Sequence, residues 1–119
     1  MYSCCGTHTC AGYPGSFEHE FDDAEQFAAW GVDYLKYDNC YKPQHVDGEI
    51  LYKRMSLALR NSDRDIVLSA CNWGHEDVHS WIRGSGAQLF RSTGDIQDNW
   101  QSVKNLFLSQ LDKTAFSGP

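Results

Sequence analysis

Strand-like runs alternate with helical patterns along this 119-residue chain. The runs lie at residues 32–37, 65–70 and 88–91, and each is followed by apolar residues at helical spacing. Strands that alternate with helices are typical of βα units around a parallel sheet. The sequence therefore predicts an α/β fold.

Amphipathic helices are predicted before and between these strands. Asp22 and Glu25 form a capping-box pattern, from which a helix would run to Gly31. Helices in βα units usually cover the sheet, so the apolar stripes of two further helices, within residues 46–60 and 97–111, are predicted to be core faces. Those stripes are Leu51, Met55, Ala58 and Leu59, and Trp100, Val103, Phe107 and Leu111.

About four βα units fit in the chain, whereas a closed (β/α)8 TIM barrel needs eight. Tyr2 and Ser3 resemble the tail of a strand, and residues 116–119 stop where a loop should lead to the next strand. A sheet of this size would have two open edges. We therefore expect residues 1–119 to be a fragment of one larger catalytic domain.

The charge balance argues against several classes of partner. Ten basic and 16 acidic residues give a net charge of −6, and the basic residues are scattered, so no nucleic acid is expected as a partner. No apolar run is long enough to span a membrane. Residues 1–5 lack the features of a signal peptide, so a cytoplasmic location is expected unless residues before Met1 carry an export signal.

The five cysteines are an odd number, so at least one is unpaired or pairs with another chain. Cys10 and Cys40 both follow predicted strand ends. They are either joined by a disulfide under oxidising conditions or are two buried, reduced thiols.

Two carboxylates follow predicted strands. The period of two puts Lys36 and Asp38 on one face of a strand, where the cation favours an ionised carboxylate. The alternative is that Asp38 and Asn39 form a turn or a cap. An ionised carboxylate can attack the anomeric carbon of a sugar.

Asp95 follows Arg91 and precedes a predicted helix, so it is either the N-cap of that helix or a free carboxylate. If Asp98 forms the cap with Gln101, then Asp95 can face a ligand. Retaining glycosidases place two such carboxyl groups about 5 to 5.5 Å apart.

Two groups of residues have the side-chain types of a metal site, and neither has both the spacing and the context that a site needs. His75, Glu76 and His79 have the spacing of a zinc peptidase motif, but they lie at the start of a short helix, where surface histidines are the simpler interpretation. The cysteines and His8 within residues 4–10 are too close together for tetrahedral closure. No metal and no cofactor are therefore expected.

Several segments together resemble glycoside hydrolase family 27, the melibiase-type α-galactosidases. The most specific are Lys36-Tyr37-Asp38-Asn39-Cys40 and the run from Arg91 to Trp100. Residues 6–16, 27–40 and 55–59 also match, so the resemblance covers almost the whole chain. It implies a (β/α)8 barrel, present here from the end of the third strand through the sixth helix.

The resemblance also implies an activity and a set of site residues. The activity is retaining hydrolysis of terminal α-galactosides by double displacement, with an α-galactoside oligosaccharide as substrate. Asp38 matches the nucleophile and Asp95 the acid/base. The implied sugar-binding residues are Lys36, Arg91, Tyr2, Cys10, Asn72 and Trp73, and Cys10 and Cys40 match a disulfide of secreted relatives.

The residue at position 72 bears on the specificity. Several relatives have Glu where this chain has Asn72, the position that reads the sugar's 2-substituent. An α-N-acetylgalactosaminidase, a β-L-arabinopyranosidase and a non-catalytic carbohydrate-binding remnant are therefore alternatives. Other sugar-binding groups would lie outside residues 1–119, so the isolated chain is expected to have little activity. The sequence also leaves open whether the complete enzyme is a homo-oligomer.

Overall fold

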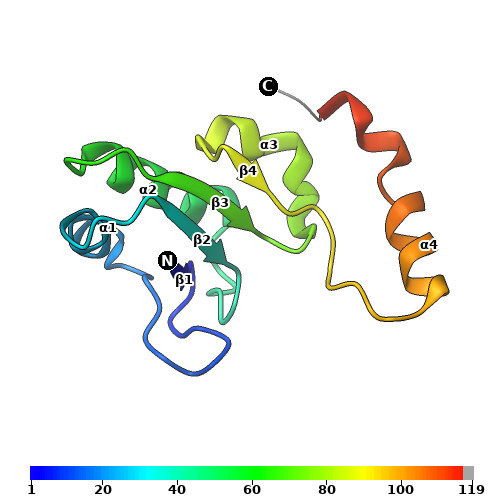
Figure 1. Cartoon of the computed structure of the whole chain (residues 1–119), viewed down its shortest axis with the longest axis horizontal. Coiled ribbons are helices and arrows are strands. Elements are labelled where there is room, and N and C mark those ends of the chain that lie inside the picture. Colours follow the sequence, from blue (N-terminus) through cyan, green and yellow to red (C-terminus); the bar gives the residue numbers. More distant parts are fainter. Residues whose placement is uncertain (117–119) are drawn as a thin grey trace.

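The computed structural model describes residues 1–116, which form a four-stranded parallel sheet with helices between the strands (Figure 1). The sheet order is β1-β2-β3-β4, so each strand pairs with the one before it in the chain. The strands are β1 (Tyr2–Cys4), β2 (Tyr34–Asp38), β3 (Val67–Cys71) and β4 (Leu89–Phe90). The helices are α1 (Glu20–Ala29), α2 (Gly48–Asn61), α3 (Val78–Ser85) and α4 (Trp100–Leu108), with 3-10 turns η1 (His75–Asp77) and η2 (Leu111–Phe116).

The α/β prediction is confirmed: the sheet is parallel and its strands alternate with helices. The loop expected at residues 116–119 lies, beyond Phe116, outside the described residues. Within residues 1–116, none of the helices is long and apolar enough to cross a bilayer.

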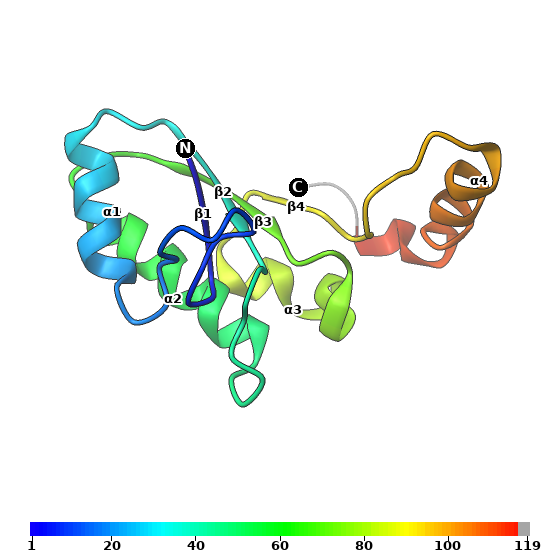
Figure 2. The ribbon, with the colours of Figure 1, turned by 90° about the horizontal axis from the view of Figure 1, so that it is seen from below.

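Helices α1, α2 and α3 lie along one side of the sheet (Figure 2). Since successive side chains of a strand point to opposite faces, Leu35 and Tyr37 of β2 face these helices and are fully buried. The predicted stripe of α2 is buried in the same core, as expected. The core also includes Ala24 and Phe27 of α1, Leu68 and Ala70 of β3, and Val78 and Ile82 of α3.

The start of α1 differs from the prediction. The helix begins at Glu20, after His19, so Asp22 lies inside the first turn and the predicted capping box is wrong. Glu20 is buried and pairs with Arg54 of α2 at 2.8 Å, which ties the helix start to its neighbour. The acidic residues of this turn suit the positive end of the helix dipole.

Helix α4 forms at the predicted place but does not cover the sheet. It stands apart from the strands (Figure 1), and the side chains of Trp100 and Phe107 are 76% and 65% exposed. The prediction that this stripe is a core face is therefore wrong for the described residues. The physical reason is that the connection after β4 leads away from the sheet, and residues 1–116 contain no later strand for α4 to cover.

Candidate active site

The open face of the sheet carries polar side chains at the carboxyl ends of the strands. Strand register pairs Tyr2 with Lys36, Cys4 with Asp38, and Asp38 with Cys71. Because Leu35 and Tyr37 face the helices, Lys36 and Asp38 point to the opposite face, as the period of two predicts. Parallel α/β proteins place their chemistry at these strand ends.

Asp38 is the centre of this group. Its carboxylate is almost enclosed, with the residue 5% exposed. The Tyr2 hydroxyl donates to Oδ2 at 3.1 Å, and the Lys36 ammonium lies 3.6 Å from the same oxygen. The Asn39 backbone N–H donates to Oδ1 at 2.9 Å. Both oxygens therefore have a donor or a cation, an arrangement that stabilises a buried negative charge.

Tyr2 stays a hydrogen-bond donor at neutral pH. Burial, followed by the nearby charge of Asp38, raises the pKa of Tyr2 to about 12. The Lys36 ammonium lies 5.4 Å from the centre of the Tyr2 ring, which favours a cation–π contact. Tyr2, Lys36 and Asp38 thus form one connected group.

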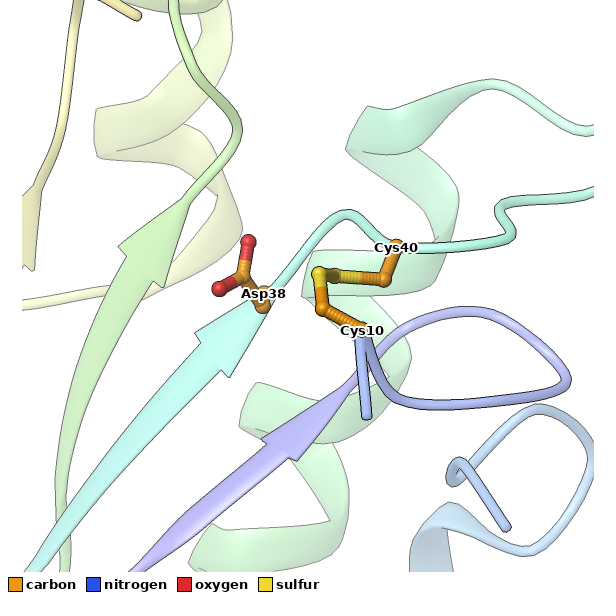
Figure 3. A group of neighbouring side chains, drawn as sticks. All are labelled: Cys10, Asp38 and Cys40. Carbon is orange, nitrogen blue, oxygen red and sulfur yellow. A yellow bond between two sulfur atoms is a disulfide. The ribbon is translucent and has the colours of Figure 1, made fainter. Parts of the chain in front are cut away.

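A disulfide between Cys10 and Cys40 lies next to this carboxylate (Figure 3). It links the loop after β1 to the segment after β2, and its sulfur atoms and an Asp38 oxygen lie within 4.8 Å of one another. The disulfide interpretation is therefore confirmed over two reduced thiols. Since both sulfur atoms are bonded to each other, the group is not available to a metal. The remaining cysteines, Cys4, Cys5 and Cys71, are free and buried.

Cys71 is a member of the site that sequence reasoning missed. It lies beside Asp38 in the sheet, and its thiol interacts electrostatically with both Asp38 and Arg91. Burial, and then the charge of Asp38, raises the pKa of the Cys71 thiol, so it stays protonated. Correct alignment of the third strand with the second would have placed Cys71 beside Asp38.

Asp95 lies on the loop after β4, and its side chain is 89% exposed. It pairs with Arg91, whose Nη1 atom is 2.6 Å from Oδ1. Helix α4 is capped by Asn99, which accepts from the Ser102 amide at 2.8 Å, so neither Asp95 nor Asp98 is the cap. The prediction for Asp98 is wrong, but Asp95 is free of a capping role. No hydrogen bond or ion pair joins Asp95 to Asp38 in the described part of the chain.

Asn72 and Trp73 follow β3. Asn72 is 0% exposed, and among residues 1–116 neither its side-chain oxygen nor its nitrogen has a hydrogen-bond partner. Trp73 is partly buried and packs edge-on against the His75 ring. This loop therefore carries an unsatisfied buried amide close to the strand end.

The geometry argues against the zinc motif. Glu76 and Asp77 have left-handed backbone conformations, so His75 and His79 do not share one face of a continuous helix. The His79 ring packs against Phe116. Near the N-terminus, the Cys4 thiol donates to the His8 carbonyl at 3.0 Å, which is an ordinary hydrogen bond.

Known proteins resemble this chain in both sequence and structure. The family model described as alpha galactosidase A matches residues 1–116. Alpha-galactosidase 2 of Arabidopsis thaliana is 49% identical over 116 residues, which are 97% of this chain and 28% of that protein. An alpha-galactosidase of Saccharomyces pastorianus is 55% identical over 101 residues, or 81% of this chain and 21% of the relative.

Solved structures agree with these matches. A crystal structure from Bacteroides fragilis superposes with a TM-score of 0.91 at 36% identity, over 99% of this chain and 28% of the other. The alpha-galactosidase of Saccharomyces cerevisiae, solved with raffinose, gives a TM-score of 0.75 at 44% identity, over 83% of this chain and 23% of the other. This chain thus spans about a quarter of the length of these relatives.

Proposed function

The chain belongs to the alpha galactosidase A family, and on that premise we propose that the protein carrying it hydrolyses terminal α-galactosides with retention of configuration. Residues 1–119 would supply four consecutive βα units of a single catalytic barrel. The yeast relative was solved with raffinose, an α-galactoside, which supports this class of substrate.

The observation that carries the proposal is the environment of Asp38. A nucleophilic carboxylate must be ionised and fixed in place, and Asp38 is held by Tyr2, Lys36 and the Asn39 amide on the face of the sheet that points away from the helices. In the first step an Asp38 oxygen forms an ester bond with the anomeric carbon while the glycosidic bond breaks. Water then attacks the same carbon, which releases galactose and restores the carboxylate.

Asp95 is the proposed acid/base of both steps. It gives a proton to the leaving oxygen in the first step and takes one from the attacking water in the second. Asp95 is held by the ion pair with Arg91, so this pair has to open before Asp95 can reach the leaving oxygen. Once the pair is open, Arg91 would be free to donate to a sugar hydroxyl, and Asp95 would be free to transfer the proton.

The remaining predicted residues would form the sugar pocket. Lys36 and Tyr2 lie beside the nucleophile, and the Cys10 to Cys40 disulfide forms a wall next to it. Asn72 and Trp73 lie on the next loop, where an unsatisfied amide is suited to recognising a polar substituent at the sugar's 2-position.

The test is to replace Asp38 in the complete protein. Asp38→Asn should lower kcat for a nitrophenyl α-galactoside at least about a thousandfold, because no carboxylate remains to form the ester. Asp47→Asn is the matched control, since Asp47 is exposed and its side chain makes no capping hydrogen bond. Azide should restore turnover to Asp38→Gly and yield the β-galactosyl azide. An Asp38→Asn variant that keeps more than a tenth of the activity would contradict the proposal.

A further inference from the structure

The loop between β3 and α3, residues 72–77, lies between the segment that follows Asp38 and the segment that leads to Asp95. On one side it contacts the segment between β2 and α2, which follows Asp38. On the other side it contacts the segment after β4, which leads to Asp95. We call residues 72–77 the bridging loop.

Glu76 makes the first of these contacts. Its Oε1 atom lies 2.8 Å from the Lys42 ammonium, and its Oε2 atom accepts from the Gly48 backbone N–H at 2.7 Å. Lys42 also donates to the Val46 carbonyl at 2.5 Å, so its ammonium group contacts both Glu76 and the backbone of its own segment. One carboxylate thereby binds two points of the neighbouring segment.

This carboxylate takes the place of a helix cap. Gly48 is the first residue of α2, and Asp47 before it makes no side-chain capping hydrogen bond. Glu76 instead supplies a negative charge and an acceptor to the helix start from a different loop. A Cβ atom at Gly48 would lie 2.6 Å from Glu76 Oε2 and 3.3 Å from Asn72 Nδ2, so a side chain there would displace the Glu76 carboxylate from this position.

Gly74 makes the contact on the other side. It has φ +86°, and a Cβ atom there would lie 2.3 Å from the Ser92 carbonyl oxygen and 3.4 Å from the Thr93 Cα. The backbone of the bridging loop therefore packs directly on the segment that joins Arg91 to Asp95. A displacement of the bridging loop has to move that segment or break this contact.

The bridging loop is strained and needs external contacts to hold its shape. Trp73, Glu76 and Asp77 all have positive φ, at 63°, 55° and 46°. Side chains at such positions persist only when their surroundings fix them. Besides the two contacts of the Glu76 carboxylate, the Trp81 indole N–H donates to the Glu76 carbonyl at 2.7 Å.

We propose that Glu76 is a positioning residue, which fastens the bridging loop to the segment after Asp38 and so keeps the acid/base Asp95 in line with the nucleophile. The inference rests on the proposed function. Glu76 does not need to touch the sugar for this role, because it acts through the backbone of the bridging loop, which packs on the Asp95 segment at Gly74.

The test measures two substrates with variants of the complete protein. Raffinose needs a proton for its leaving oxygen, whereas 2,4-dinitrophenyl α-galactoside has a leaving group that departs without one. Glu76→Ala should lower kcat for raffinose about tenfold more than for the dinitrophenyl substrate, because the acid/base is displaced. Glu76→Gln should recover most of the loss, since its amide oxygen still accepts from Gly48. Glu49→Gln is the control, because Glu49 is exposed in the first turn of the same helix.

A second measurement covers the case in which Glu76→Ala does not fold. Lys42→Met removes the cation that holds Glu76 Oε1, so it should also lower kcat for raffinose more than for the dinitrophenyl substrate. Equal losses on both substrates would overturn the positioning role. A wild-type protein with no activity on either substrate would overturn the proposed function as well, whereas an active wild type with an unaffected Glu76→Ala would overturn this inference alone.

Discussion

Removal of the Cys10 to Cys40 disulfide should cost much more stability than activity. The bond joins residues 30 positions apart. For a loop of this length, the chain-entropy model gives a stabilisation of about 3.6 kcal/mol through the unfolded state. With an m-value of about 2 kcal/mol per molar, the urea midpoint of the Cys10→Ser, Cys40→Ser variant should fall by about 1.8 M.

The two segments should nevertheless stay together in the folded state. The Cys5 amide donates to the Asp38 carbonyl at 2.8 Å, and the Thr7 amide donates to the Tyr41 carbonyl at 3.3 Å. Gly6 packs against the backbone of Cys40, with no room for a side chain. Because these contacts do not depend on the sulfur atoms, kcat for a nitrophenyl α-galactoside should fall less than about tenfold.

The assay compares urea unfolding with and without a reducing agent. Reduction should shift the midpoint of the wild-type protein and leave that of the double serine variant unchanged. An unchanged wild-type midpoint on full reduction would refute the reasoning about loop closure. A large loss of turnover with an unchanged midpoint would show that the bond acts on the site and not on the unfolded chain.

Four further outcomes are expected. Arg54→Met should lower the free energy of unfolding by about 3 kcal/mol, because it leaves the buried Glu20 carboxylate unpaired; urea unfolding should show that adding Glu20→Gln recovers more than half of this, and an additive second loss would contradict it. Burial alone would raise the pKa of Glu76, but the hydrogen bonds from Lys42 and Gly48 outweigh it and hold that pKa below its usual value of 4.5. The stabilising contribution is thus complete above the unfolded-state pKa and is lost as the pH falls through the folded-state pKa. The stability difference between wild type and Glu76→Gln at pH 7 should therefore shrink as the pH is lowered below 4.5, as measured by unfolding at each pH. Among nitrophenyl glycosides, the α-galactoside should have the highest kcat/KM, and a preference for the α-N-acetylgalactosaminide would assign the other specificity. Alkylation of the denatured, unreduced chain should modify three thiols, counted by mass spectrometry; labelling of all five would contradict the disulfide, and the three expected are Cys4, Cys5 and Cys71.

The positions of most elements could be predicted from hydrophobic periodicity. The α2 stripe is buried as expected, and the predicted strands lie within two residues of β2, β3 and β4. The α4 stripe has the same spacing, but Trp100 and Phe107 are exposed. Periodicity shows that a helix has an apolar face, and it does not show what covers that face.

The helix starts were harder to predict, because several acceptors compete at each one. Asp22 and Asp98 both have the residue type and spacing of a cap, yet α1 begins before Asp22 and Asn99 caps α4. A local sequence pattern does not reveal an ion pair with a residue on another helix, such as the pair between Glu20 and Arg54. The choice between neighbouring acceptors is therefore made by tertiary contacts.

For the site, the period of two correctly placed Lys36 and Asp38 on one face. The contact of Tyr2 with Asp38 and the position of Cys71 depend on the register between neighbouring strands. The sequence of one strand alone does not determine that register. The contacts on which the proposed role of Glu76 rests are also tertiary ones. The spacing of Glu76 from two histidines suggested a metal motif, whereas its partners come from a segment about 30 residues earlier in the chain.

The order of strands in the sheet has a consequence for how the chain acquires its fold. Since β1, β2, β3 and β4 lie side by side in the order of synthesis, no strand has to wait for a later one to fill a gap between earlier ones. The helix contacts follow the same order, from α1 to α2 and from α2 to α3. A ribosome that delivers this polypeptide from its N-terminus can therefore extend the sheet one βα unit at a time, with each new unit docking on the edge left by the last.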